Sequence, residues 1–288
     1  MNSALNKVKE FLLGKCPGLD DIDEDFELIE NRVIDSLSFV TFVFLIEETS
    51  GESIDMNALR IDDFRTLRRI GERYFGRSPE TVPERVLRVE RASLLPMLRG
   101  APADAFDRPT VCVGWSVRDV LAHCAGALTG LAGEPDYVAS HERNQSDVEL
   151  RRARPVGLVL DELEHGLATA GPVIAAAGGT KDLAALGTWI HGGDVRDALG
   201  EPDAYASAGA DDALTLLVNS ERVARTPLVR LTLADREITL GIAAADRGPA
   251  SLSTDLATLF RLYTGRPAKP DRYELRGATL DELVSADW

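Results

Sequence analysis

The spacing of apolar residues changes character about two-thirds of the way along this chain of 288 residues. Up to about residue 200, apolar side chains recur at intervals of three or four, which predicts amphipathic helices. Residues 228–233 and 237–242 instead alternate apolar and polar side chains, and residues 234–236 fit the turn between two paired strands. The pattern predicts a mainly helical protein that ends in a small α+β unit.

The helical part falls into two groups, because residues 76–79 read Gly-Arg-Ser-Pro and predict a short linker. Helices are expected before it over residues 4–14, from Ser36 onward, near residues 57–59 and over residues 66–74. Helices are expected after it over residues 84–98, 116–126, 156–170 and 183–199. In the tail, a strand is expected over residues 273–275 and helices over residues 253–264 and 280–285. The polar residues His141, Asn144 and Gln145 are expected in a loop at the mouth of a pocket.

The composition limits the class of function. With 44% hydrophobic and 27% charged residues, the chain reads as a globular protein of two or three domains. Its net charge of −15 argues against binding to nucleic acid or to an anionic membrane surface. Cys16, Cys112 and Cys124 are scattered rather than arranged as a disulfide framework, which favours a reducing, cytoplasmic location.

Ser36 stands where an acidic loop, residues 20–30, meets a strongly apolar segment, residues 37–46. The position predicts a helix N-cap. The positive end of the helix dipole at this point would favour a phosphate ester on the serine. A plain helix cap with no modification is the alternative interpretation.

Three phrases around Ser36 resemble the acyl and peptidyl carrier proteins: residues 26–37, which include Asp-Ser-Leu, residues 45–54 and residues 64–70. The resemblance covers residues 1–76 and implies an all-α carrier domain built as a four-helix bundle. It implies that Ser36 carries 4'-phosphopantetheine, whose thiol holds an acyl or aminoacyl thioester. It also implies three kinds of partner: a phosphopantetheinyl transferase, an acyl- or amino-acid-activating ligase, and downstream biosynthetic enzymes.

A second resemblance follows a linker at residues 77–82. Residues 114–123 and 189–200 resemble the DinB-like bundle of the mycothiol-dependent maleylpyruvate isomerases, and residues 248–266 resemble the sterol-carrier-like domain that often follows it. The resemblance implies an all-α, DinB-like four-helix bundle over residues 83–202. It implies a small α+β domain over residues 203–288.

The same resemblance implies a divalent metal, zinc or another ion, inside the bundle. His123 and His191 match the two histidine ligands of that family, and neutral imidazole is a good zinc ligand. The carboxylate that commonly stands four residues before the second histidine is replaced by Gly187. Asp194, one turn after His191, is therefore the expected third ligand, although it could equally orient an imidazole from outside the metal. The remaining candidates for this ligand are Glu164 and His165.

A site without metal is the alternative, in which the two histidines are buried polar groups satisfied by hydrogen bonds. Together the resemblances imply that Ser36 presents a tethered acyl group to the bundle, which performs thiol-linked transfer, addition or isomerisation in natural-product biosynthesis. Two other interpretations stay open. The bundle could be a non-catalytic docking or shielding module with a degenerate metal site, or it could use an external thiol such as mycothiol.

Overall fold

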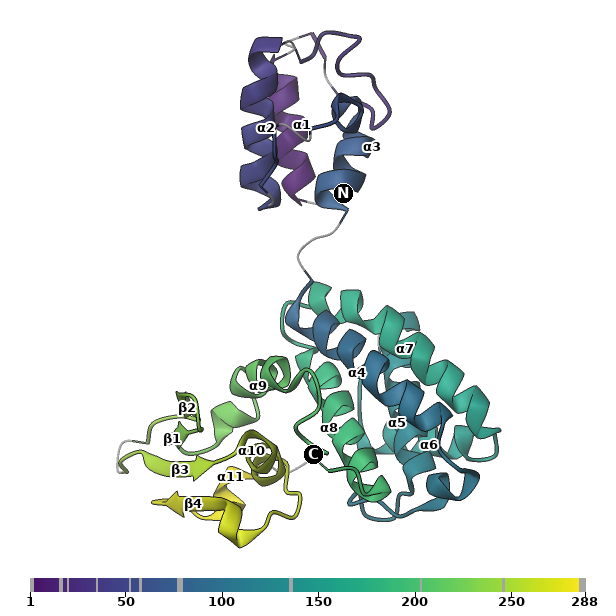
Figure 1. Ribbon diagram of the computed structural model, residues 1–288, viewed down its shortest axis with the longest axis vertical. Helices are drawn as coiled ribbons and strands as arrows, with labels where there is room; N and C mark the ends of the chain where they lie inside the picture. The colour runs from purple at the N-terminus through teal and green to yellow at the C-terminus, as the bar shows by residue number, and fades with distance from the viewer. Residues whose placement is uncertain are drawn as a thin grey trace. The chain divides into compact units, whose positions relative to one another are not determined.

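The structure is a computed structural model, and its helices and strands fall into two compact units, Met1–Glu80 and Thr81–Trp288 (Figure 1). It describes residues 3–15, 18–19, 21–34, 36–51, 53–56, 59–76, 80–134, 137–202, 204–244 and 247–284. For residues 3, 4, 36 and 37 it describes the backbone alone. Each unit is described separately below.

The N-terminal unit is helical. Helix α1 (Ser3–Lys15) packs against α2 (Ser36–Ser50), and a 3-10 turn (Ile61–Phe64) precedes α3 (Leu67–Ile70), which continues as a π-helical turn (Gly71–Phe75). The apolar faces of these segments form one core, which includes Val8, Leu12, Phe42, Ile46, Phe64 and Ile70. Of the short helix expected near residues 57–59, residues 57 and 58 lie outside the described part of the chain.

Helix α2 begins at Ser36, one residue earlier than an N-cap at Ser36 predicts. Asp35 and the Ser36 side chain lie outside the described part of the chain. The acidic loop before α2 is held to α3 by ion pairs: Arg68 donates to Asp25 at 2.6 Å and 2.9 Å, and Arg65 donates to Glu27 at 3.1 Å. The loop is therefore fixed in place by charge as well as by its buried residues.

Four long helices form the bundle of the second unit: α4 (Val82–Arg99), α5 (Val117–Gly133), α7 (Val156–Ala176) and α8 (Asp182–Leu199). All four are expected from the apolar spacing. Helix α5 begins with a capping box, in which Ser116 and Asp119 satisfy each other's backbone amides at 3.1 Å and 3.3 Å. Helix α8 ends at Gly200, whose left-handed φ of 80° suits glycine.

A further helix, α6 (His141–Arg152), takes the place of the polar loop expected around residues 141–145. It has no apolar stripe for sequence spacing to reveal, because only Asp147, Val148 and Arg151 are buried. Ser140 caps its first turn by accepting from the Arg143 amide at 3.1 Å. Arg151 pairs with Asp147 and with Glu162 on α7, so charge rather than apolar burial holds α6 to the bundle.

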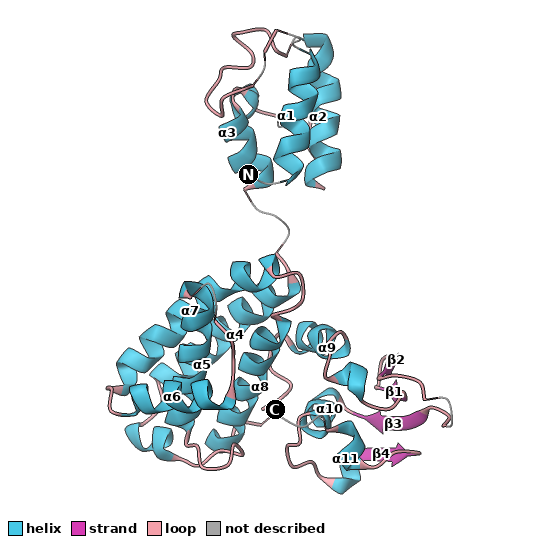
Figure 2. Cartoon of the chain, turned by 180° about the vertical axis from the view of Figure 1, so that it is seen from behind, coloured by secondary structure: helices cyan, strands magenta, loops and turns pink. Residues whose placement is uncertain are grey.

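The C-terminal part consists of helices, the nearest of which lie beside α8, and a four-stranded sheet farther from α8 (Figure 2). Its helices are α9 (Ala210–Val218), α10 (Leu256–Tyr263) and α11 (Leu280–Leu283), and its strands are β1 (Val229–Thr232), β2 (Glu237–Leu240), β3 (Ala250–Thr254) and β4 (Tyr273–Arg276). The strand order is β2-β1-β3-β4, with β1 and β3 parallel and the other pairs antiparallel.

The predicted hairpin is present as β1 and β2, but α9 and β3 are not apparent from the sequence pattern. The start of the helix expected from residue 253 belongs to β3, because Asp255 caps α10 and ends the strand. On the bundle side, the Trp189 ring of α8 meets the Phe260 ring of α10 with centroids 4.5 Å apart. Bundle and sheet therefore share one apolar core.

In the part of the chain that the structure describes, no helix combines the length and the apolar character that crossing a membrane requires.

Candidate functional site

Two cavities meet between α5, α6 and α8. One has a volume of about 760 Å³ and the other about 530 Å³, and both are lined by His123, Ala139, Asn144, His191 and Arg222. The larger one is also lined by the turn before α5 and by Arg266. Among the described residues, no Asp or Glu lines either cavity, although the protein carries a net charge of −15. The lining is therefore locally suited to anionic or electron-rich ligands.

His123 projects from α5 into this space. Its ring meets the His191 ring edge to face with centroids 5.1 Å apart, and Trp115 lies on another side at 5.2 Å. Burial, with a smaller contribution from His191, lowers the pKa of His123 to about 3. Its Nδ1 atom is buried and has no hydrogen-bond partner among the described residues. His123 is thus a neutral imidazole with an unused ring nitrogen.

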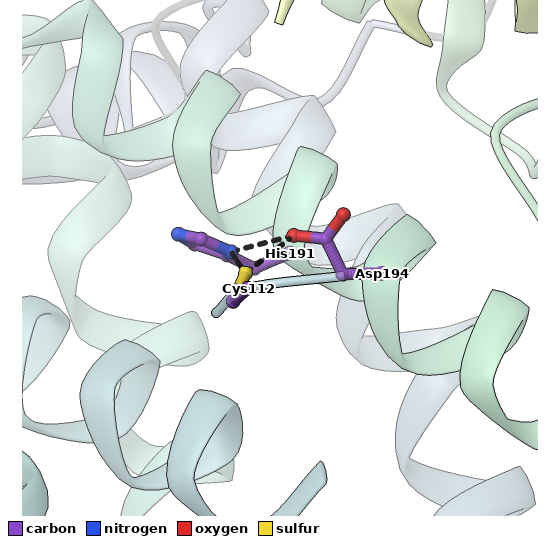
Figure 3. A group of neighbouring side chains, drawn as sticks. All are labelled: Cys112, His191 and Asp194. Carbon is purple, nitrogen blue, oxygen red and sulfur yellow. Dashed lines mark hydrogen bonds and ion pairs between the residues drawn. The ribbon is translucent and has the colours of Figure 1, made fainter. Parts of the chain in front are cut away.

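His191 lies on α8 and is oriented by Asp194, one helical turn further on (Figure 3). The two side chains meet through Nδ1 and Oδ2 at 2.9 Å. Burial alone would raise the pKa of Asp194, but hydrogen bonds and charges from His191 and Arg266 hold it well below its usual range. Because Asp194 is a carboxylate, it accepts a hydrogen bond from His191 Nδ1, and Nε2 is the ring nitrogen that is not bound to it.

Asp194 is completely buried and is held by groups from distant parts of the chain. Arg266 donates to its two oxygens at 3.0 Å and 2.7 Å, and the Tyr205 hydroxyl donates to Oδ1 at 2.5 Å. Tyr205 reaches it across Gly193 of α8, where an added Cβ would lie 2.5 Å from the tyrosine ring. A residue without a side chain is required there so that the ring can approach the helix.

Cys112 joins the group from the turn before α5. Its thiol donates to Asp194 Oδ2 at 3.2 Å and lies 3.7 Å from His191 Nδ1. Burial and then the neighbouring Asp194 raise the pKa of the Cys112 thiol to about 12, so the free thiol is protonated. Cys112 could not be predicted as a site residue from the sequence, because it stands 79 residues before His191 and no local spacing connects them.

Metal ligation fits this arrangement. Two imidazoles bound to one tetrahedral ion place their ring centroids roughly 5 Å apart, given metal–nitrogen distances of about 2.0–2.1 Å. The His123 and His191 rings have this separation. A second set of ligand atoms, from Cys112, His191 and Asp194, lies within 4.8 Å of one another. Asp194 lines neither cavity and already accepts from several donors, which suits an orienting role better than a ligand role.

The other candidates lie elsewhere. Gly187 lines the smaller cavity one turn before His191 and supplies no ligand. Glu164 accepts from Arg99 at 2.8 Å, and His165 is exposed; neither lines a cavity. Of the polar residues assigned to a pocket mouth, His141 and Asn144 do line the larger cavity, but from helix α6 rather than from a loop. The third, Gln145, pairs with Glu149 on the surface of that helix.

Comparison with known proteins bears on the bundle. Residues 87–201 match the sequence profile of the mycothiol maleylpyruvate isomerase N-terminal domain. The crystal structure of the mycothiol-dependent maleylpyruvate isomerase is similar with a TM-score of 0.54 and 17% identity, over 71% of this chain and 96% of that one. A mutant of that enzyme is similar with a TM-score of 0.51 and 14% identity, over the same shares of the two chains. No curated protein matches the sequence.

These matches confirm the predicted likeness of the bundle and its small α+β tail to the maleylpyruvate isomerases at the level of fold. The matched residues 87–201 begin after the N-terminal unit, so the profile does not bear on the carrier domain. The carrier assignment therefore stays a prediction from the phrases around Ser36.

Proposed function

We propose that the Thr81–Trp288 unit is a thiol-dependent isomerase or thiol transferase, and that the N-terminal unit carries its substrate as a thioester on 4'-phosphopantetheine at Ser36. The observation that carries the enzymatic part is the pair of imidazole rings, His123 and His191, which meet edge to face at a cavity whose described lining holds no carboxylate. The proposal places this activity in natural-product biosynthesis, where a ligase loads the arm.

His123 and His191 would hold a divalent ion such as zinc, with Cys112 as the third ligand. Cys112 lines the larger cavity with both histidines, and its thiol lies 3.7 Å from His191 Nδ1. When bound, such an ion lowers the pKa of a thiol and polarises a carbonyl, and a thiolate adds reversibly to an activated double bond.

The protein's own groups prepare the site. Asp194 fixes the tautomer of His191 and aims its Nε2 lone pair away from the carboxylate. Arg266 and Tyr205 keep Asp194 in place, so the imidazole is oriented before any ligand arrives. Arg222, at the junction of the two cavities, adds positive charge where an enolate or carboxylate oxygen of the substrate would lie.

The thiol that serves the site is either an external one, such as mycothiol, or the pantetheine arm. We favour the arm as the carrier of the substrate, because the acidic loop and the apolar helix flank Ser36 as in carrier proteins. A substrate tethered in the same chain reaches the cavity at high effective concentration, which removes the need for tight binding.

The carrier part is tested by intact mass spectrometry after co-expression with a phosphopantetheinyl transferase. The wild-type chain should gain the mass of one phosphopantetheine group, and Ser36→Ala should not. Ser38→Ala, two residues further along α2, is the matched control and should still be modified. An unmodified wild-type chain overturns the carrier assignment.

The enzymatic part is tested by metal content and by cobalt substitution. Purified protein should contain about one ion per chain, and His123→Ala or His191→Ala should reduce this strongly. A thiolate-to-cobalt absorption band that Cys112→Ser removes would identify the third ligand. If the wild-type protein contains no metal and the tethered substrate reacts equally well in the wild-type protein and in both histidine variants, the result supports the non-catalytic docking module instead. The glycine at position 187 favours that alternative.

A further inference from the structure

The residues that line the smaller cavity differ from those of the larger cavity, which holds Cys112 and Arg266. Two helices contribute a small or apolar part of its lining: Cys124, Ala127 and Leu131 from α5, and Leu183, Ala184 and Gly187 from α8. On α5 these residues stand three and four positions apart, so they occupy one face of the helix. The rest of the lining includes Lys181 and Arg222 as well as the two histidines. The volume of about 530 Å³ is within the range of pockets that hold small ligands.

Gly187 makes room in this cavity. An ideal Cβ built at this position meets no atom within 4 Å, so the fold does not require glycine there for lack of space. Its backbone is helical, so the fold does not require glycine for a left-handed conformation either. In a helix interior glycine costs about 0.5–1 kcal/mol relative to alanine. The empty volume beside the helix is what the glycine provides.

Two polar atoms at the cavity wall lack partners among the described residues. Asn144 Oδ1 and the Tyr137 hydroxyl are both buried without a hydrogen bond. Tyr137 is 8% exposed and lines the smaller cavity, and Asn144 lines both cavities where they join. A buried polar group without a partner is unfavourable, and a ligand that supplies one satisfies it. Asn144 would supply an acceptor to an amide N–H of a pantetheine arm if its side chain turns toward the cavity.

From these observations we propose that the smaller cavity is the subsite for an apolar acyl chain of the substrate, with Gly187 setting its depth and Asn144 binding the pantetheine amide at its entrance. This inference rests on the proposed function, because it takes the substrate to be an acyl thioester of pantetheine. It adds the chemical class of the acyl group, which is a chain of several carbons rather than an acetyl group.

The orientation of the substrate follows. The acyl chain lies between α5 and α8, and the thioester lies near His123 and His191, which border both cavities. The arm passes through the larger cavity, whose lining includes Arg222 and His141. Substrate selection would therefore depend on the length of the acyl chain, whereas the chemistry would depend on the two histidines. Substrate selection and reaction rate could then be changed by separate substitutions.

The test measures binding without turnover. The probes are acetyl-, butyryl-, hexanoyl- and octanoyl-pantetheine amides, in which nitrogen replaces the thioester sulfur. They are titrated calorimetrically into the full chain bearing Ser36→Ala, so that no tethered arm competes. The Kd should tighten about fourfold for each added methylene that the cavity accepts, as expected for burial of one CH₂ group.

Gly187→Leu should remove this dependence on chain length and leave acetyl binding within about twofold of its starting value. The matched control is Gly157→Leu on α7. This glycine is also helical and also has no atom within 4 Å of an added Cβ, but it is exposed and lines neither cavity. The control should keep the dependence. Asn144→Leu should weaken all four probes by a similar factor, because the amide is common to them.

Three results overturn the proposal: no probe binds, acetyl and octanoyl probes bind equally to the parent chain, or Gly187→Leu retains the full dependence while its thermal unfolding is unchanged. If Gly187→Leu does not fold, Gly187→Ala decides, since it should shift the longest accepted chain by about one methylene. The titration needs neither a bound metal nor a loaded Ser36. Its result can therefore be interpreted even if the carrier test or the metal test fails.

Discussion

At the scale of single residues, the two histidines of the site lie in unlike surroundings. His191 is held by a carboxylate that is ionised and saturated with donors, whereas His123 has a buried nitrogen without a partner among the described residues. The first arrangement fixes a tautomer, and the second leaves a lone pair for a ligand. Their difference assigns different roles to two histidines that the sequence alone treats as equivalent.

His123 makes the stability of the metal-free protein depend on pH. The unfolded chain takes up a proton as the pH falls through about 6.5, whereas the folded chain does so only near 3. The stabilisation is therefore complete above about pH 6.5 and is lost as the pH falls toward 3, at up to about 1.4 kcal/mol per pH unit. Urea unfolding in the presence of a chelator should show this, and His123→Leu should lessen the fall between pH 6.5 and 4.5. An equal fall in both proteins would contradict a neutral, buried His123.

A carboxylate restored at position 187 should strengthen metal binding. Gly187→Glu adds a potential oxygen ligand one turn before His191, and its Cβ meets no atom within 4 Å. The zinc affinity, measured by competition with a chromophoric chelator, should rise roughly tenfold or more. Gly157→Glu on α7 serves as control and should change nothing. If Gly187→Glu binds zinc no better than the parent, the two histidines do not share an ion.

At the scale of elements, α8 carries the site because three separate segments support it. Gly193 admits the Tyr205 ring, Arg266 from the loop after α10 clamps Asp194, and Arg196 pairs with the buried Glu90 of α4 at 2.8 Å. The C-terminal part is thus a structural component of the histidine site rather than an appendage. Helix α6 is likewise held by contacts from another segment, because it has no apolar stripe and its Arg151 pairs with Glu162 of α7.

Removing Arg266 should destabilise the second unit strongly. Arg266→Ala leaves the Asp194 carboxylate buried without its guanidinium partner, at a cost of about 3–5 kcal/mol in the free energy of unfolding. The measurement is urea denaturation followed by tryptophan fluorescence. Arg266→Met combined with Asp194→Asn should recover much of the loss, because no uncompensated charge stays buried. A double variant as unstable as Arg266→Ala would show that packing of the arginine, not the charge pair, is what matters.

At the scale of the whole molecule, the chain contains two cores that share no residue. The core of the first unit includes Phe42 and Phe64, and the core of the second runs from the bundle into the sheet through Trp189 and Phe260. Each core can therefore be perturbed by a substitution that leaves the residues of the other unchanged.

The two units should unfold as separate cooperative transitions. Phe42→Ala should lower only the first unit's stability, and Phe260→Ala only the second's, each by about 3–5 kcal/mol as expected for a fully buried aromatic ring. Calorimetry of the full chain, together with residues 81–288 expressed alone, measures this. A single transition that both substitutions shift equally would contradict independent units.

The sequence by itself determined the elements whose signals are local. Helical spacing located α4, α5, α7 and α8, the Ser116 and Asp119 pair marked the start of α5, and alternation marked the hairpin. It also indicated His123 and His191 as site residues through short phrases. Helix α6 and strand β3 were missed. The first is held by ion pairs, and the second has only two apolar residues, Ala250 and Leu252, and runs directly into the segment expected to be helical.

Only the tertiary structure decided how the site is completed. Cys112 lies 79 residues from His191 in the chain, and Arg266 lies 72 residues from Asp194, yet they meet in one cluster. Their contact depends on how α8 packs against the turn before α5 and the loop after α10, which no local spacing encodes. The two joined cavities, and the room that Gly187 leaves in one of them, likewise arise from the packing of whole helices.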